Sequence, residues 1–523
     1  MISAMSTPGP LEAHCAQLQD TLRAAVSWQA LPAATTAACI SGARDALRAA
    51  RGDLAAAVLE RLVAHAPGDA GAWQLLGFVY GDEQRIAEAA HAFSRAAALA
   101  PEDPLTAFAQ AQAHLDAGLP AESLFARAQA LAPADLAAVG GRAAALNAQG
   151  DRSAAEALLA DTLRRCPDWL PGHRSLVALR WSAGDSREFT GSYAIACRLL
   201  PGSLPLRLAW FGTLVQARDW EAALRVVVDG EAVLGALPGL AAARAVLAAE
   251  SGDAALAAEW FARTESIRDD GLDIAHVRHC LRTGQLEKAE RLALGLVGGR
   301  SARMAWPYLS VIWRLRGDAR AAWLDGSPPC IRTFDLDWPT GELAALAALL
   351  RRLQTARAPY VDQSVRGGTQ TDTDRQLLFR AEPEIQSVRT RICGAVSEYI
   401  AGLPAAVSGH PLLGTPRGRF LFSGSWSVRL NPAGHHVSHT HPKGWISSAL
   451  YVSLPPPAAL GTAPAGWIRF GVPPGVPGID LPPYAQVEPR PGRLVLFPST
   501  MWHDTLPFAD GERLVIAFDV IPR

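Results

Sequence analysis

The chain has 523 residues, of which 49% are apolar and 19% charged, and its formal net charge is −1. This composition excludes global disorder, and it lacks the basic excess typical of a general nucleic-acid binder. No stretch approaches the 18 consecutive apolar residues of a membrane span. The first ten residues have no secretory-signal pattern, and the seven cysteines are scattered without a CxxC motif. We therefore expect reduced thiols and a cytoplasmic location.

Residues 1–325 are rich in alanine, leucine and arginine and carry an internal repeat. Prolines follow apolar helical runs at spacings of 34, 32, 34 and 34 residues, and a glycine-containing turn lies midway between successive prolines. These prolines are Pro67, Pro101, Pro133, Pro167 and Pro201. A period near 34 with one turn and one proline per unit predicts an array of helical hairpins. The alternative is an unrelated alanine-rich helical bundle.

One unit of this array resembles the tetratricopeptide repeat closely. Residues 73–80, WQLLGFVY, reproduce the W-x2-L-G-x2-Y pattern, and Ala89 and Phe93 continue it as A-x3-F. Gly77 would let the two helices of the hairpin approach closely, and Pro101 would end the second helix. The resemblance implies a groove that binds peptides or proteins, here a protein or carrier-linked substrate. The alternative is an array that only spaces or dimerises the rest of the chain.

Residues 326–415 are expected to form a linker and supporting helices. A proline-containing linker precedes predicted helices over residues 343–357 and 384–403. Between these helices lies a polar segment with paired glycines, QSVRGGTQT, at residues 363–371. Its default interpretation is a structural loop, although a loop that reaches a site is the alternative, since such segments often carry function.

Residues 416–523 change to a β pattern. The runs RFLFSGSWSVRL, WISSALYVSL, GWIRFGV, GRLVLFP and RLVIAFDVI are short, rich in valine, isoleucine and aromatic residues, and separated by glycine and proline. Several such runs within about 110 residues predict a β-sandwich or barrel.

A histidine cluster in this region carries the candidate chemistry. His439 and His441 are two residues apart, so on a strand both imidazoles would point to one face and could bind one metal ion. His503 follows the run RLVLFP, and Arg513 comes ten residues later. A surface histidine-rich turn is the alternative to a metal site.

This layout resembles the iron(II)/2-oxoglutarate oxygenases over roughly residues 418–522, and it is closest to a bacterial subgroup that couples tetratricopeptide repeats to this domain. The resemblance implies a multidomain α + β protein, in which an α-solenoid precedes a double-stranded β-helix (jelly-roll) with flanking helices. It places Fe(II) on His439, His441 and His503, and the distal carboxylate of 2-oxoglutarate on Arg513. The implied reaction consumes O2, releases succinate and hydroxylates a substrate that the repeat array recruits.

Two positions depart from the family pattern. The usual metal triad is two histidines and one carboxylate, but the middle position is His441, and residues 399–479 contain no aspartate or glutamate. Asp504 lies beside His503, but on a strand it would point to the opposite face. Three histidines are therefore the most economical ligand set, and such a set also suits zinc, copper or nickel. Val515 stands where related enzymes often have a hydroxyl residue that helps to hold the co-substrate.

Further residues are candidates for the neighbourhood of this site. For the co-substrate they are Arg429, Tyr451 and Ser448, with Ser427 and Thr505 as weaker possibilities. For outer contacts of the metal ligands or for substrate they are His436, Trp445, Trp502, Gln363 and Arg366. The competing interpretations are a core role for the tryptophans and an exposed strand-edge position for Arg429.

Two other functions remain open at this point. A cupin-like protein could use three histidines without 2-oxoglutarate, and the β domain could have lost catalysis, leaving a repeat scaffold for protein interaction. Arg513 argues against the cupin-like alternative, and Val515 slightly favours it.

Overall fold

A computed structural model describes residues 9–24, 32–185, 187–326, 330–361, 363–372, 375–475 and 479–523. The chain divides into two compact units. One comprises Met1–Leu158, Leu378–Gln386 and Arg523, and the other comprises Leu159–Leu377 and Ser387–Pro522. The boundaries expected from the sequence, at residues 325 and 415, stay a prediction. Among the described residues, no helix is long and apolar enough to cross a membrane.

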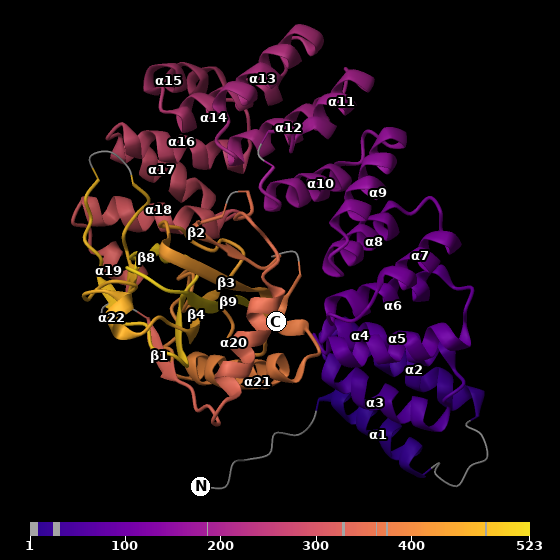
Figure 1. Cartoon of the computed structure of the whole chain (residues 1–523). Helices are drawn as coiled ribbons and strands as arrows, with labels where there is room; N and C mark the ends of the chain where they lie inside the picture. Colours follow the sequence, from indigo (N-terminus) through magenta and orange to yellow (C-terminus); the bar gives the residue numbers. More distant parts are fainter. Residues whose placement is uncertain are drawn as a thin grey trace. The chain divides into compact units, whose positions relative to one another are not determined.

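The first unit is an array of paired helices (Figure 1). Its helices are α1 (Pro10–Ala24), α2 (Ala33–Arg48), α3 (Gly52–His65), α4 (Ala70–Asp82), α5 (Ile86–Leu99), α6 (Pro104–Asp116), α7 (Glu122–Leu131) and α8 (Leu136–Ala148). The unit boundary falls within α9 (Arg152–Arg165).

The repeating prolines mark where one helix ends and a cap for the next one follows. Two residues after Pro67 and Pro101, the carboxylates of Asp69 and Asp103 accept hydrogen bonds from the first turns of α4 and α6. Such caps satisfy backbone N–H groups that the helix itself leaves unpaired. The period near 34 is therefore the distance from one pair of helix-ending proline and capping aspartate to the next. This confirms the predicted helical hairpins.

Gly77 brings the two helices of one hairpin together. It lies on α4, and a Cβ atom at this position would meet the ring of Phe93 on α5 at 2.7 Å. The ring therefore packs directly against the helix backbone, as the tetratricopeptide pattern predicts. Around this contact Leu76 and Phe93 are both buried.

The second unit continues the array and contains the β domain. Its helices are α10 (Leu170–Ser182), α11 (Gly191–Leu199), α12 (Leu204–Gln216), α13 (Trp220–Leu234), α14 (Pro238–Ser251), α15 (Ala254–Arg263), α16 (Asp270–Arg282), α17 (Leu286–Leu296), α18 (Ala302–Leu315), α19 (Arg320–Asp325), α20 (Glu342–Leu353) and α22 (Pro457–Leu460). The short helix η2 (Leu377–Phe379) and α21 (Pro383–Ala401) cross a unit boundary.

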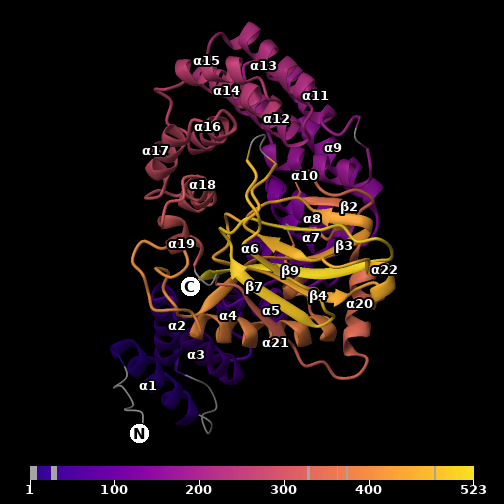
Figure 2. The same ribbon diagram turned by 90° about the vertical axis from the view of Figure 1, so that its left-hand side faces the viewer.

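Two antiparallel sheets form the double-stranded β-helix. The strands are β1 (Arg332–Asp335), β2 (Val365–Gln370), β3 (Phe420–His436), β4 (Ile446–Ser453), β5 (Ile468–Phe470), β6 (Ala485–Val487), β7 (Arg493–Pro498), β8 (His503–Thr505) and β9 (Arg513–Pro522). The large sheet has the order β1-β7-β4-β9-β3-β2, and the small sheet has the order β6-β5-β8. Figure 2 shows β3, β9, β4 and β7 as neighbouring strands.

Residues 365–370 of the polar segment form strand β2, so the default expectation of a loop is wrong for these residues. β2 pairs with β3, and the register shifts between Arg366 and Gly368. Gly367 has a φ of +67°, and a Cβ on Gly368 would lie 2.4 Å from the carbonyl oxygen of Arg429. The paired glycines allow this bulge and close approach, which is why a segment with few β-forming residues still joins the sheet.

Helix α20 covers one face of the large sheet, leaving the other face for the site. On α20, Leu346 and Leu350 are buried, while Gln354, just after the helix, donates to the carbonyl oxygen of Ser427 at 2.9 Å. Because side chains alternate along a strand, residues on β3 and β9 divide between this covered face and the interior of the β-helix.

Candidate metal centre

His439 and His441 lie in the connection between β3 and β4. The prediction that they lie on a strand is therefore wrong in detail. The backbone N–H of His439 donates to the carbonyl of His503 at 3.0 Å, and the reverse bond measures 3.1 Å. The N–H of His441 donates to the carbonyl of Ser499 at 3.0 Å. The connection is thus hydrogen-bonded to the chain around β8, and this pairing brings the early histidines to the late one.

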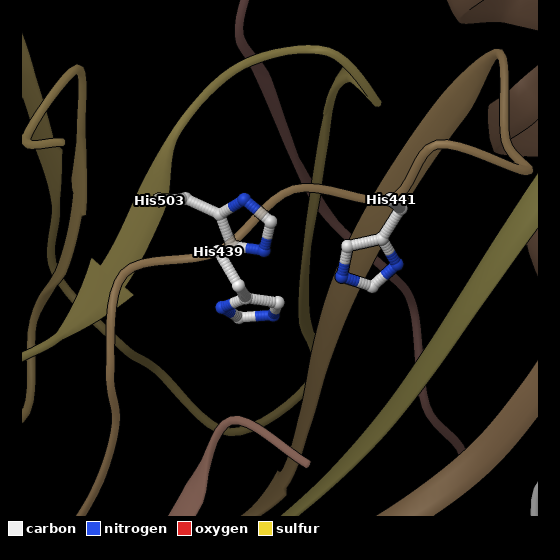
Figure 3. Close-up of side chains that lie close together, drawn as sticks. All are labelled: His439, His441 and His503. Carbon is white, nitrogen blue, oxygen red and sulfur yellow. The ribbon is translucent and has the colours of Figure 1, made fainter. Parts of the chain in front are cut away.

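The three imidazoles form a single cluster. Each of His439, His441 and His503 offers a ring nitrogen, and these nitrogens all lie within 4.8 Å of one another. The ring centroids are 4.2 Å apart for His439 and His503, and 5.0 and 5.1 Å from these two to His441. Figure 3 shows the three side chains around a common space. Three imidazoles at this spacing suit one transition-metal ion.

The outer hydrogen bonds of the rings select which nitrogen faces that space. His439 Nδ1 lies 2.9 Å from the carbonyl oxygen of Val437. His503 Nδ1 lies 3.0 Å from the carbonyl oxygen of Met501. In His441, Nδ1 lies 2.8 Å from the carboxylate of Asp519. These acceptors require the proton on Nδ1, so every Nε2 keeps its lone pair for a metal.

Burial keeps two of the three imidazoles, His439 and His503, neutral. Burial and the proximity of His441 lower the pKa of His439 to about 3. Burial and the neighbouring imidazoles hold the pKa of His503 well below its usual range. A metal competes with protons for the same nitrogen lone pairs, so rings that stay neutral fit a metal site.

Two residues that touch these histidines were missed in the sequence analysis. The Ser364 hydroxyl lies 2.9 Å from His436 Nδ1 and 3.3 Å from His439 Nε2. Asp519 contacts His441, as described above. A signal for Asp519 existed in the sequence, because it is six residues after Arg513, and an even separation places both on one face of a strand.

Arg513 is buried on the interior face of the large sheet. Its side chain is 2% exposed, Nη1 donates to the carbonyl of Gly466 at 2.8 Å, and the guanidinium lies 4.9 Å from the ring centroid of Tyr451. Burial lowers its pKa. Within the described residues no carboxylate pairs with it and its Nε has no hydrogen-bond partner. A buried, unpaired guanidinium is costly unless an anion completes it.

Two further unsatisfied polar groups share this interior. The Tyr451 hydroxyl and the Gln370 amide nitrogen are buried and lack hydrogen-bond partners in the part of the chain that the structure describes. Gln370 pairs with Val428, Val428 with Val515, and Val515 with Tyr451 across four strands. Paired residues share a face, so these two groups point into the same interior as Arg513.

The structure does not bring Arg429 or Ser448 to the histidines. Arg429 is adjacent in register to Leu514, on the face opposite Arg513, and its Nε lies 2.5 Å from Glu512. The hydroxyl of Ser448 bonds the carbonyl and the N–H of Phe518, each at 2.9 Å. Both side chains lie on the face of the sheet opposite Arg513, and the strand pairing shows this.

The weaker candidates occupy structural positions too. The Ser427 hydroxyl lies 3.3 Å from the Gln354 amide, on the face that α20 covers, and Thr505 Oγ1 accepts from the backbone of His436 at 2.9 Å. Arg366 is exposed, and its Nη1 donates to the carbonyl of Gln363 at 2.8 Å. The segment at residues 363–371 reaches the histidines through Ser364 and the interior beside Arg513 through Gln370.

The aromatic candidates divide between core and site. Trp445 is buried and donates to the carbonyl of Leu412 at 3.1 Å. Trp502 is buried against α18. Trp426 stacks on His441, with ring centroids 5.6 Å apart, and His436 stacks on His439 at the same separation. The core interpretation of Trp445 and Trp502 thus agrees with their contacts, whereas Trp426 and His436 border the cluster.

Asp504 is engaged elsewhere. Its two carboxylate oxygens lie 2.8 and 2.6 Å from Nε and Nη2 of Arg469. It therefore leaves the three-histidine set without a carboxylate from the adjoining residue, as the sequence predicts.

One known family matches part of the β domain. Residues 424–519 match the family described as "Putative 2OG-Fe(II) oxygenase". A comparison with curated protein sequences gives no match.

Solved structures similar to parts of the chain include repeat proteins and an oxygenase. MamA from Desulfovibrio magneticus RS-1 is 15% identical, covers 32% of this chain and 97% of its own, and has a TM-score of 0.29. YrrB, a TPR protein with an unusual peptide-binding site, is 16% identical, with coverages of 38% and 96% and a TM-score of 0.29. A Pseudomonas putida prolyl-4-hydroxylase is 20% identical, with coverages of 37% and 92% and a TM-score of 0.25.

Proposed function

We propose that the β domain is an Fe(II)- and 2-oxoglutarate-dependent oxygenase that hydroxylates a substrate recruited by the repeat array. One observation carries this proposal: three clustered imidazoles and a buried arginine without an anionic partner among the described residues are held within one β domain. A metal-binding set beside an anion-binding group is the arrangement that a metal-chelating dicarboxylate co-substrate requires. The family match over residues 424–519 supports the same reaction class.

In this proposal His439, His441 and His503 hold Fe(II) through Nε2. When bound, iron supplies with O2 and 2-oxoglutarate the oxidising power for a C–H hydroxylation, and the co-substrate leaves as succinate and CO2. The protein orients the rings through their Nδ1 contacts and keeps the site dry through burial. Three imidazoles also fit zinc, copper or nickel, so the ligands do not select iron by themselves. The choice of iron is therefore part of the proposal.

Arg513 would bind the distal carboxylate of 2-oxoglutarate. A planar guanidinium matches a carboxylate in geometry, and burial strengthens the pairing. Val515 on β9 has no hydroxyl group that could bind the co-substrate. Tyr451 pairs with Val515 from the neighbouring strand β4, so the Tyr451 hydroxyl would take that role. The Gln370 amide is a further donor in the same interior. These contacts would satisfy polar groups that the described protein residues leave unpaired.

The array would position the substrate. Helix α18 contacts the β domain next to the metal cluster, because Trp502 adjoins His503 and its indole nitrogen donates to the carbonyl of Pro307 at 2.9 Å. On the same helix, Arg314 donates to the carbonyl oxygens of Gly471 and Pro482. These contacts hold α18 against the β domain, and a protein or carrier-linked substrate held by the repeats is part of the proposal. The seven cysteines are free, which agrees with the proposed cytoplasmic location.

The test is 2-oxoglutarate turnover and binding by the full-length protein. We expect slow, Fe(II)-dependent release of succinate without added substrate, and its loss in His503→Ala. With zinc in the site, 2-oxoglutarate should bind measurably by calorimetry, and Arg513→Leu should weaken this binding by at least tenfold. Unchanged binding in Arg513→Leu would refute the carboxylate assignment.

The second candidate is a three-histidine metalloprotein that does not use 2-oxoglutarate, and it is favoured because the cluster contains no carboxylate among the described residues. Metal-dependent turnover that ignores 2-oxoglutarate would support this candidate. Failure to turn over with any divalent metal would favour a non-catalytic scaffold.

A further inference from the structure

Asp519 is a buried carboxylate with one nitrogen partner. It lies on β9 and is 6% exposed, and its Oδ2 accepts from Nδ1 of His441 at 2.8 Å. Among the described residues no lysine or arginine forms an ion pair with it. A buried charge without a counter-charge is strongly disfavoured. Its compensation must therefore come from the imidazole and from whatever the imidazole binds.

The surroundings hold this carboxylate in place. The Ser447 hydroxyl donates to Asp519 Oδ1 at 2.5 Å and lies 2.9 Å from the Ser499 hydroxyl. All of these groups are buried. A Cβ at Gly444 would lie 2.4 Å from the Ser499 hydroxyl and 3.1 Å from the Asp519 Cβ. The turn after His441 therefore needs glycine at residue 444 so that the chain can pack over this network.

We infer that Asp519 supplies, through His441, the negative charge that a three-histidine metal site otherwise lacks. This inference rests on the metal site of the proposed function. Three neutral imidazoles leave the full 2+ charge of a divalent ion, and one carboxylate beyond the ring lowers the total to 1+. A carboxylate that accepts the Nδ1 proton also makes Nε2 a stronger donor and fixes the ring orientation. Asp519 is a positioning residue, because it acts on the metal only through His441.

The chain offers a contrast that separates this role from burial alone. Asp504 is also a 6% exposed aspartate on a strand of the same domain, but both its oxygens bind Arg469. Its charge is compensated without the metal cluster. The two aspartates are equally buried but differ in their partner, which is Arg469 for Asp504 and His441 for Asp519.

The experiment measures metal affinity without 2-oxoglutarate. Apo full-length protein is titrated with Co(II), and binding is followed by calorimetry and by the visible absorption of the ion. We expect Asp519→Asn, which keeps an acceptor for Nδ1–H but removes the charge, to bind Co(II) about 10–100-fold more weakly. Asp504→Asn should stay within about threefold of wild type. Equal affinity of Asp519→Asn and wild type, or equal losses in both variants, would overturn the inference.

A second pair of variants keeps the test valid if Asp519→Asn does not fold. Ser447→Ala removes one hydrogen bond to Asp519 and should weaken Co(II) binding several-fold. Ser448→Ala, on the opposite face of β4, should not change it. Equal Co(II) affinities in the two serine variants would contradict the inference.

The outcomes for metal and co-substrate separate the two proposals. A weaker Co(II) affinity in Asp519→Asn, in a protein that never binds 2-oxoglutarate, would sustain the Asp519 role and refute the oxygenase. If the wild-type protein turns over 2-oxoglutarate and Asp519→Asn keeps its metal affinity, the oxygenase is sustained and the Asp519 role is refuted. A wild-type protein that binds no divalent metal would refute both.

Discussion

The indole nitrogen of Trp502 donates a hydrogen bond to the carbonyl of Pro307 at 2.9 Å, so the residue beside the metal-site His503 is bonded to repeat helix α18. The ring of Tyr308 packs edge-on against the same indole, with centroids 5.5 Å apart. In this unit the array and the β-helix therefore share a packed core. A change in α18 can therefore alter the position of Trp502 and of the neighbouring His503.

We expect Trp502→Phe to loosen this junction. The phenyl ring keeps most of the packing but removes the indole N–H that the Pro307 carbonyl accepts besides its helical bond, which should cost about 0.5–1.5 kcal/mol in the free energy of unfolding. Hydrogen exchange should become faster in α18. Trp445→Phe loses a comparable bond to Leu412 and is the control, for which exchange in α18 should not change. Equal exchange rates in α18 for both variants would argue against coupling through Trp502.

Tyr451→Phe should separate stability from co-substrate binding. The Tyr451 hydroxyl is buried without a partner among the described residues. Its removal should therefore leave the free energy of unfolding in urea unchanged or raise it slightly. Binding of 2-oxoglutarate to the zinc form should weaken several-fold in calorimetry. In Tyr399→Phe, which loses a 2.7 Å bond to the Cys330 carbonyl, stability should fall while binding stays the same. The reverse pattern would refute the assignment.

Gly77→Ala should destabilise the repeat hairpin by about 1–3 kcal/mol, because the added methyl group meets the Phe93 ring at 2.7 Å and the core must shift. Gly81→Ala on the same helix is the matched control. Nothing lies within 4 Å of its added Cβ, so the better helix propensity of alanine should stabilise the protein by up to about 1 kcal/mol. Urea denaturation of both variants gives the comparison, and a loss of similar size in both would contradict it.

Asp325 should make stability depend on pH. Burial raises its pKa to about 6 in the folded protein, although Ser310 donates to it at 2.7 Å. The folded state then holds a proton that the unfolded state releases, so stability is highest below about pH 4 for this group and is lost as pH rises through 6. Asp325→Asn should raise the free energy of unfolding by about 1–3 kcal/mol at pH 8 and leave it nearly unchanged at pH 4. Denaturation curves at both pH values test this, and an equal gain at both would exclude the carboxyl as the cause.

Local patterns in the sequence were sufficient for the repeat helices, for strands β3, β4, β5, β7 and β9, and for the identity of the clustered histidines. The 34-residue period reflects a proline that ends one helix and a cap that starts the next, and both effects act within a few residues. The resemblance to the oxygenase family pointed to Arg513, ten residues after His503, and Asp504 could be excluded because alternate residues of a strand point to opposite faces. These inferences need no knowledge of how distant segments meet.

The polar neighbours of the site required the tertiary structure. Ser364 reaches His436 and His439 only because β2 joins β3 around a glycine bulge, and the segment looked like a loop on its own. Arg429 and Ser448 looked like co-substrate contacts until strand pairing placed them on the opposite face from Arg513.

The sequence by itself determined that no carboxylate between residues 399 and 479 could join the histidines, since none exists there. Only the tertiary structure decided that a carboxylate still lies beside them, because β9 runs antiparallel next to β4 and brings Asp519 to His441, 78 residues earlier. Composition counts charges along the chain, whereas electrostatic interactions depend on distances in space, and sheet pairing sets those distances.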